Sequence, residues 1–374
     1  MTAADPGDRP AVVLTRPPAL APLLARGALR SPFRRPRPDA PFPRARLVLP
    51  SVRPDLARLA AYERVCGFAT GEDTLPVTYP HVLGFPLAMR LMSGGGFPLP
   101  LLGLVHTSIT VTRHTALPAA GAYDLAVRVD GLAAHRRGTQ ATVVTELRAG
   151  GDLVWESAST YLARHRPHTP ATGGSGPTGN GYGDPTGDGH GDPGGGRADL
   201  VGDGRPDPAR DGHRRAAGDG RPDPARDGRG DLAGDSRPAA LRDGRADPLR
   251  DGRADPLRDG RAPLPAVGQW RLAGDLGRRY GAASGDRNPI HLHPLTARLF
   301  GFPRAIAHGM WTVARCLAAH GTPDAARVRA AFRAPVPLPG ALTYAADGRG
   351  RFELRSADAT ARLHLVGEVE PLRP

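Results

Sequence analysis

Asp286 and His291 are the two residues of this sequence whose types and spacing best suit acid–base chemistry. They lie in the string Y-G-A-A-S-G-D-R-N-P-I-H-L-H-P-L-T-A, which covers residues 280–297. Asn288 followed by Pro289 is a favourable helix start, because the Asn side chain can accept a hydrogen bond from a free amide and proline loses none there. Asp286 is therefore expected in the loop before a helix and His291 in its first turn. A carboxyl group and an imidazole placed in this way can hold one water molecule, one taking a proton while the other gives one.

The helix predicted at this point would end near Gly301 and Pro303. Its apolar face would carry Leu292, Leu295 and Leu299. Simpler roles are also open to the polar residues, since an aspartate before a helix is commonly a cap and a histidine in a first turn is commonly solvated. Ser-Gly-Asp is likewise a common turn sequence. Residue types and spacing alone therefore leave both interpretations open.

The complete string resembles the signature of the MaoC-like, (R)-specific 2-enoyl-CoA hydratase family. That signature is an aromatic residue, then S-G-D-x-N-P-I-H and, after five more residues, an alanine; here it runs from Tyr280 to Ala297. The resemblance implies a hotdog fold, in which a curved antiparallel sheet wraps around one long apolar helix. We therefore expect an α+β protein built on this fold.

The resemblance also implies an activity and roles for individual residues. Asp286 and His291 would hold one water molecule for the reversible hydration of a trans-2-enoyl thioester to the (R)-3-hydroxyacyl thioester. Asn288 would fix the loop, and Ser284 would be a substrate-binding residue or only a turn residue. The substrate would be an acyl-CoA or acyl carrier protein thioester, and neither a metal nor a further cofactor is expected. Two alternatives stay open, a hotdog thioesterase and a non-catalytic acyl-thioester-binding subunit.

A second string, A-I-A-H-G-M-W-T-V-A-R-C-L, follows at residues 305–317. Its apolar stripe predicts the central hotdog helix over residues 306–317. Gly309 near the helix start would cost roughly 1 kcal/mol relative to alanine, so its presence needs a reason. In the family that the string resembles, backbone amides at this helix start form an oxyanion hole for the thioester carbonyl; the alternative is close packing of helix on sheet. His308 is expected to be packed or hydrogen-bonded rather than catalytic.

The composition suits a two-domain protein and argues against one class of partner. The chain has 374 residues with a hydrophobic share of 40%, enough for ordinary cores. Its net charge of +13 would suggest nucleic acid, but all 50 basic residues are arginine, and Gly (49) and Pro (41) are also abundant. This bias is typical of a G+C-rich genome. Because aromatic interleaving and a recognisable binding motif are both missing, nucleic acid is not an expected partner.

Cys66 and Cys316 are too few for a disulfide framework and lack metal-ligand spacing, so both are expected to be small apolar packing residues. The sequence has no apolar run of about 18 residues, the length that a membrane-spanning helix needs. An apolar stretch near the N-terminus is interrupted by arginine and proline, so export is not expected. We predict a cytoplasmic protein without a membrane partner, either a monomeric double hotdog or a homodimer.

Four segments follow one another along the chain. Residues 1–45 are rich in proline and arginine, and we expect a loosely attached arm with one short helix near residues 20–29. A degenerate hotdog is predicted over residues 46–165, a disordered linker over 166–265 and the catalytic hotdog over 266–374. Each hotdog is predicted from helices and strands at the following positions. The first has a strand at 46–50, helices at 54–65 and 85–92, and strands at 103–112, 122–129, 139–147 and 153–162; the second has the helix at 306–317 and strands at 326–332, 341–346, 351–355 and 360–369.

The first hotdog lacks the string that carries the chemistry. Its corresponding loop reads G-E-D-T-L-P-V-T-Y-P-H (residues 71–81), without a D-x-N-P-x-H pattern. His81 has no aspartate at the required spacing and is expected to be structural. The resemblance to double-hotdog hydratases implies that this half surrounds the acyl chain. The apolar residues 85–92, with their flexible Met side chains, are predicted to form the wall.

The segment between the two halves repeats a charged octapeptide. D-G-R-A-D-P-L-R occurs at residues 243–250 and again at 251–258, and related copies begin at Asp203 and Asp219. The apolar content is too low to offset chain entropy, so disorder is predicted. The Asp-Gly pairs follow neither the EF-hand ligand order nor the glycine-rich calcium-binding nonapeptide. The segment is interpreted as a repeat expansion within a linker.

Overall fold

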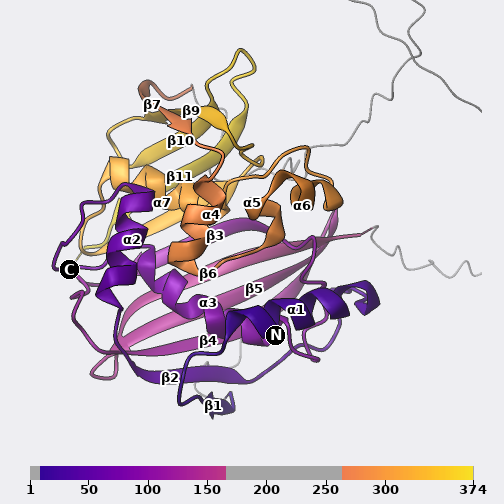
Figure 1. Ribbon diagram of the computed structural model, residues 1–374. Helices are drawn as coiled ribbons and strands as arrows, with labels where there is room; N and C mark the ends of the chain where they lie inside the picture. Colours follow the sequence, from indigo (N-terminus) through magenta and orange to yellow (C-terminus); the bar gives the residue numbers. More distant parts are fainter. Residues whose placement is uncertain (1–8, 166–262, 374) are drawn as a thin grey trace, which may run out of the picture. The chain divides into compact units, whose positions relative to one another are not determined.

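The computed structural model describes residues 9–165 and 263–373 (Figure 1). Eleven strands in these two ranges form one sheet in the order β1-β2-β4-β5-β6-β3-β8-β11-β10-β9-β7. Neighbouring strands are antiparallel, except that β1 and β2 are parallel. The predicted linker, residues 166–265, lies outside the described residues except for 263–265. Within the described ranges, no helix is long and apolar enough to cross a membrane.

The first half of the sheet packs on the buried helix α3 (Tyr79–Met92), whose Leu87 and Met92 are almost fully buried. Apolar residues alternate along β4, so that one face of the strand lies against α3. Trp155 on β6 donates from Nε1 to the Val77 carbonyl (2.8 Å), which ties the sheet to the residues before α3. The other elements of this half are β1 (Ala11–Val13), β2 (Arg46–Val52), α2 (Leu56–Cys66), β3 (Val105–Arg113), β4 (Tyr123–His135), β5 (Gly138–Ala149) and β6 (Asp152–Arg164).

The second half of the sheet packs on α7 (Gly309–His320) in the same way. Val313 and Leu317 belong to the predicted apolar stripe of this helix and are at most 1% exposed, and Ala314 on the neighbouring side is also fully buried. Helix α7 contacts β10 and β11. The remaining elements are β7 (Ala266–Leu272), α4 (Leu276–Ser284), α5 (Pro289–Leu292), α6 (Pro294–Leu299), β8 (Ala326–Phe332), β9 (Gly340–Ala346), β10 (Arg351–Ser356) and β11 (Leu363–Pro371).

The two halves join through β3 and β8, an antiparallel pair in the middle of the sheet. Val111 and Val328 face each other in this register, and both are fully buried. Trp311 of α7 donates from Nε1 to the carbonyl of Val65 in α2 (2.8 Å), so the helical layer is joined as well. A helix on each half of one continuous sheet is the predicted tandem hotdog.

Residues 9–45 are packed on the first half, which corrects the prediction of a loosely attached arm. The predicted helix is present as α1 (Leu20–Arg30), and it lies against α3. Gly27 of α1 is so close to Leu101 that a side chain at this position would collide with it. Leu14 and Leu23 are each 8% exposed and belong to the core. The composition of this segment does not reveal that it is packed, because only a few apolar residues make the contacts while proline and arginine are abundant.

The helix predicted after Asn288 is broken into α5 and α6. Proline disfavours helical backbone in the residue before it, and His293, which precedes Pro294, is accordingly extended (φ −148°, ψ 143°). Leu295 and Leu299 are 62% and 83% exposed. The predicted buried apolar face is therefore wrong for these two leucines.

Other element predictions differ from the structure mainly in extent. The strand predicted at 326–332 has the same bounds as β8, whereas α3 starts before the predicted residue 85. Strand β7 and helix α4 are not among the predicted elements. Cys66 and Cys316 are both fully buried, as expected of small apolar packing residues.

Candidate active site

The loop between α4 and α5 holds Asp286 through hydrogen bonds on both sides. Ser284 Oγ donates to the Tyr280 carbonyl (2.8 Å) and accepts from the Asp286 amide (3.2 Å). The Asn288 amide donates to Asp286 Oδ1 (3.2 Å), and Asn288 Oδ1 accepts from the amide of Ile290 (3.4 Å). Asn288 is thus the N-cap of α5, as predicted, and Ser284, the last residue of α4, supports the loop through its hydroxyl group.

Two glycines of α4 allow this loop to lie directly against the helix. A Cβ atom on Gly277 would collide with the carbonyl of His291, and one on Gly281 would come within 2.8 Å of the carbonyl of Asp286. Residues four apart lie on one face of a helix, so both glycines face the loop. The sequence signal that could have found these two positioning residues is their four-residue spacing at the start of the Asp286–His291 string.

His291 lies in α5 and is 8% exposed. Its Nδ1 is 2.8 Å from the carbonyl oxygen of Ile306. A carbonyl oxygen can only accept, so Nδ1 carries the hydrogen of the neutral ring and Nε2 keeps a lone pair. The imidazole can therefore accept a proton on Nε2 without losing the hydrogen bond that orients it.

His308, the residue before α7, packs face to face on His291 with the ring centroids 3.7 Å apart. Its Nε2 donates to the backbone carbonyl of Asp286 (2.9 Å) and lies 3.9 Å from Asp286 Oδ2. Its Nδ1 is buried without a hydrogen-bond partner among the described residues. His308 is thus packed and hydrogen-bonded, as the sequence predicts, and it holds the backbone that carries Asp286.

Burial shifts the proton affinities of these groups in opposite directions. It raises the pKa of Asp286, against the lowering effects of His291 and the Asn288 amide; the carboxyl side chain stays 28% exposed, which limits the shift. Burial lowers the pKa of His291, against the raising effects of Asp286 and the Ile306 carbonyl. Burial and the neighbouring His291 hold the pKa of His308 well below its ordinary value. Both histidines are therefore neutral at neutral pH. The pKa of Asp286 and that of His291 are closer to each other than they would be in water.

Helix α7 begins at Gly309, beside this pair. Its N-cap, His308, makes no side-chain hydrogen bond to the first-turn amides, which also have no acceptor within the helix. These amides can bind an oxygen atom, and the helix dipole favours negative charge on it. A Cβ atom on Gly309 would lie 3.0 Å from the Phe332 ring. Close packing therefore accounts for the glycine, and it also keeps the helix start clear of a side chain.

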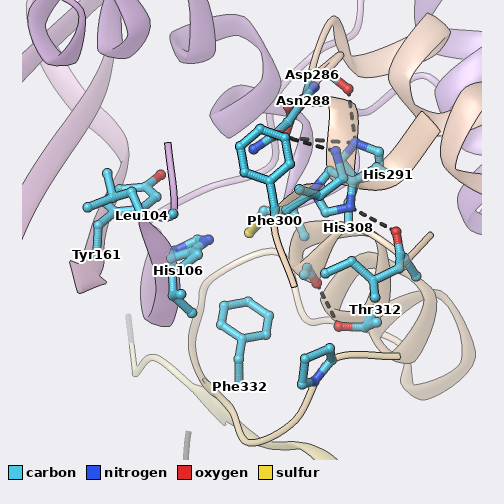
Figure 2. A pocket seen from close by; sticks show the side chains of 18 of the residues that line it. Leu104, His106, Tyr161, Asp286, Asn288, His291, Phe300, His308, Thr312 and Phe332 are labelled. Carbon is cyan, nitrogen blue, oxygen red and sulfur yellow. Dashed lines mark hydrogen bonds and ion pairs between the residues drawn. The ribbon is translucent and has the colours of Figure 1, made fainter. Parts of the chain in front are cut away.

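The five predicted site residues line one cavity of about 500 Å³ (Figure 2). They are Ser284, Asp286, Asn288, His291 and Gly309. The first half contributes other lining residues, including Phe85, Met89 and Met92 of the predicted wall, as well as His81, His106 and Tyr161. Ala88 does not line the cavity and is buried in the core at 6% exposure. Both halves of the sheet therefore enclose the same space.

Asp286, His291 and His308 present three candidate metal-ligand atoms within 4.8 Å of one another. The two imidazole rings are stacked at an interplanar angle of 26°, so their in-plane lone pairs lie in nearly parallel planes. One nitrogen of each ring is also bonded to a backbone carbonyl. This arrangement suits hydrogen bonding to one small molecule better than it suits a metal ion.

A tandem hotdog with this loop beside the start of its second central helix is the arrangement that the resemblance to MaoC-like double hotdogs predicts. Residues 271–348 match the family model for the MaoC like domain. Residues 271–348 therefore carry a MaoC-like domain.

Known proteins resemble the chain over nearly its whole length. The sequence is 29% identical over 363 residues to 3-hydroxyacyl-thioester dehydratase X of Mycobacterium tuberculosis, an alignment covering 96% of this chain and 100% of the relative. A crystal structure of HtdX from the same organism has a TM-score of 0.58 at 26% identity, covering 87% of this chain and 100% of that one. A crystal structure of a MaoC-like dehydratase from Phytophthora capsici, with a TM-score of 0.54 at 15% identity, covers 90% of this chain and 96% of that one and supports the fold alone.

Proposed function

We propose that this protein is a hydro-lyase that interconverts trans-2-enoyl thioesters and (R)-3-hydroxyacyl thioesters. The observation that carries the proposal is that Asp286 and His291 line the same cavity beside the first turn of α7. The relative from Mycobacterium tuberculosis is named a 3-hydroxyacyl-thioester dehydratase, which supports the same reaction class. The (R) configuration rests on the resemblance of the Asp286–His291 string to that family.

The reaction requires two proton transfers, and the pair has the means for both. In the hydration direction the water oxygen bonds to the β-carbon and gives up one proton, while the electrons of the carbon–carbon double bond move toward the thioester carbonyl. The α-carbon then receives a proton, and the net change is the addition of one water molecule. His291 has a free lone pair on Nε2, and burial makes the Asp286 carboxyl easier to protonate. A water held between them can therefore exchange protons with both groups.

The negative charge that develops on the thioester oxygen needs a partner of its own. The amides at the start of α7, around Gly309, have no acceptor within the helix and lie at the edge of the cavity. We propose that these amides donate hydrogen bonds to the oxygen of the thioester carbonyl. This places the β-carbon toward Asp286 and His291.

The two alternatives predict different chemistry from the same cavity. A hotdog thioesterase would direct water to the thioester carbonyl and release a thiol. A non-catalytic subunit would bind the thioester without turnover. The pairing of a carboxyl group with a lone-pair nitrogen favours hydration, because this reaction needs a donor and an acceptor of protons at once.

One assay separates all three functions. The full chain is mixed with trans-2-butenoyl-CoA, the loss of the conjugated enoyl absorbance is followed, and free thiol is measured in the same sample. Absorbance loss without thiol, giving the (R)-3-hydroxy product on chiral analysis, is the expected result. Thiol release would identify a thioesterase, and binding without either signal would identify a non-catalytic subunit. The same comparison with an acyl carrier protein thioester identifies the carrier.

A further inference from the structure

The first half presents a cluster of three polar rings to the cavity, His81, His106 and Tyr161, which we call the first-half cluster. His106 on β3 and Tyr161 on β6 are paired in the strand register, and their rings stack at 4.6 Å between centroids. His81, near the start of α3, stacks on His106 at 6.0 Å. Figure 2 shows His106 and Tyr161 on the opposite side of the cavity from His291 and His308. The cluster therefore faces the proposed site without belonging to it.

Two nitrogen atoms of this cluster have no partner. His81 Nδ1 and His106 Nε2 are buried, and neither makes a hydrogen bond to any part of the chain that the structure describes. Buried polar atoms in folded proteins are nearly always hydrogen-bonded, to the protein, to water or to a ligand. An orphaned pair at the wall of a binding cavity therefore points to a group that the cavity binds.

The cluster is suited to an uncharged group. Burial lowers the pKa of His81 to about 4 and that of His106 to about 3, so both rings are neutral at neutral pH. Each neutral imidazole has one donor and one acceptor nitrogen. A hydroxyl group both donates and accepts, so it can satisfy either tautomer of the two rings.

The cavity wall contributed by the first half is mainly apolar. Phe85 and Met89 of α3 and Leu104 before β3 line it, and Arg164 at the end of β6 is a charged exception. An unsubstituted alkyl chain would suit these side chains but would leave both nitrogens buried without a partner. The wall is therefore built for a chain that is mainly hydrocarbon and carries a polar group.

We propose that the first-half cluster binds a hydroxyl group on the acyl chain, so that this enzyme prefers hydroxylated 2-enoyl thioesters over unsubstituted ones. This inference rests on the proposed function and adds the substrate class. The hydroxyl lies away from the reacting carbons, because His106 and Tyr161 line the opposite side of the cavity from His291 and His308 (Figure 2).

The test compares matched substrates that differ in one oxygen atom. A series of trans-2-enoyl thioesters is made in which one hydroxyl moves along the acyl chain a carbon at a time, each with its unsubstituted counterpart. N-acetylcysteamine thioesters are used throughout, since the pantothenate arm of coenzyme A carries a hydroxyl of its own. We expect at least about a tenfold higher kcat/KM for one hydroxylated member than for its counterpart, the discrimination expected when a site has unpaired polar groups.

Variants then connect the preference to the cluster. His106→Leu and His81→Leu should each lower kcat/KM for the hydroxylated thioester by a much larger factor than for its unsubstituted counterpart, so that most of the preference is lost. His106→Asn restores a polar atom and should recover part of the preference, which guards against loss through misfolding. Met89→Leu is the matched control from the same wall, and it should change both substrates of each pair by the same factor.

Three results would overturn the inference. The first is equal kcat/KM for every pair in the wild-type protein, and the second is a preference that survives in both leucine variants. The third is a loss of kcat/KM in these variants that appears with coenzyme A thioesters but not with N-acetylcysteamine thioesters. The cluster would then bind the hydroxyl group of the pantothenate arm and not one on the acyl chain. Failure of the proposed function is distinct, because the wild-type protein would then hydrate none of the thioesters.

Discussion

The two hotdog halves have the same arrangement of elements but different groups around the shared cavity. In each half a short helix, α2 or α4, precedes the central helix, α3 or α7, and α2 packs on α4 as β3 pairs with β8. Between α2 and α3 the chain runs through a loop without a helix. Between α4 and α7 it forms the loop with α5 and α6 that carries Asp286 and His291.

The difference indicates how one fold divides a binding function and a catalytic function. The second half presents a carboxyl group and an oriented imidazole next to free helix amides. The first half presents neutral rings and apolar side chains to the same cavity. We interpret the second half as the source of the chemistry and the first as the source of substrate selection.

The largest effect is expected from the proposed catalytic pair, Asp286 and His291. Asp286→Asn or His291→Ala should each lower kcat for hydration by about 100-fold or more, since each removes one of two proton-transfer groups. Asp275→Asn, outside the cavity on the same half, is the matched control and should retain activity. Thermal unfolding of all three variants shows whether the fold is kept. Wild-type turnover in either pair variant would contradict the catalytic assignment.

A smaller effect is expected where α4 supports the loop. Gly277→Ala places a methyl group against the His291 carbonyl, so the loop must move. We expect a loss of about 1–3 kcal/mol in unfolding free energy, as for overpacking in a core. Activity should fall by roughly tenfold or more, because small misplacements of catalytic groups are costly.

Gly131→Ala, in the first half, is the control for this glycine, since nothing lies within 4 Å of its Cβ position. Gly131→Ala should change activity and unfolding free energy less than Gly277→Ala does. If Gly277→Ala were as active as the wild type, close approach of α4 would not be what positions His291.

The two neutral histidines of the first half should make the unfolding free energy depend on pH. The folded-state pKa values of His81 and His106, about 4 and about 3, lie below the ordinary 6.5. Below 6.5 the unfolded chain binds more protons, so the unfolding free energy falls as pH falls from 6.5 toward 4. Each histidine contributes roughly 1 kcal/mol per pH unit to this slope.

His81→Leu should therefore flatten the dependence of unfolding free energy on pH between 4 and 6.5, relative to wild type. Denaturant unfolding at several pH values measures it. Asp286, whose pKa burial raises, has the opposite sign, but it is present in both proteins and cancels in the difference. Identical slopes would show that the His81 ring can take up a proton in the folded protein.

The sequence predicts the catalytic half better than the shared cavity, for a physical reason. Asp286, Asn288 and His291 are close in the sequence, so local capping and turn rules place them correctly. His106 and Tyr161 reach the cavity only through strand pairing and the β3–β8 junction, which no local pattern encodes. The periodicity rules find strands and the two central helices, but they miss α4.

The missed elements have identifiable causes. Helix α4 contains Gly277 and Gly281, which lower helix propensity while allowing the loop to pack. The break at His293 could have been predicted from Pro294. The spacing of the leucines instead favoured one continuous helix. The attachment of residues 9–45 depends on a few long-range contacts, such as that of Gly27 with Leu101, that composition cannot reveal.

The smallest effect is expected from the segment that joins the halves. The halves already meet through β3 and β8, so the covalent connection adds little beyond its closure entropy. Replacing residues 166–262 with a Gly/Ser linker of about 30 residues, whose r.m.s. span is about 30 Å, should leave kcat/KM within about twofold. Shortening the loop from about 100 to about 30 residues should raise the unfolding free energy by only about 1 kcal/mol. Loss of active protein in this variant would show that the octapeptide repeat contributes to folding or to the site, and the two halves could no longer be treated as the complete working unit.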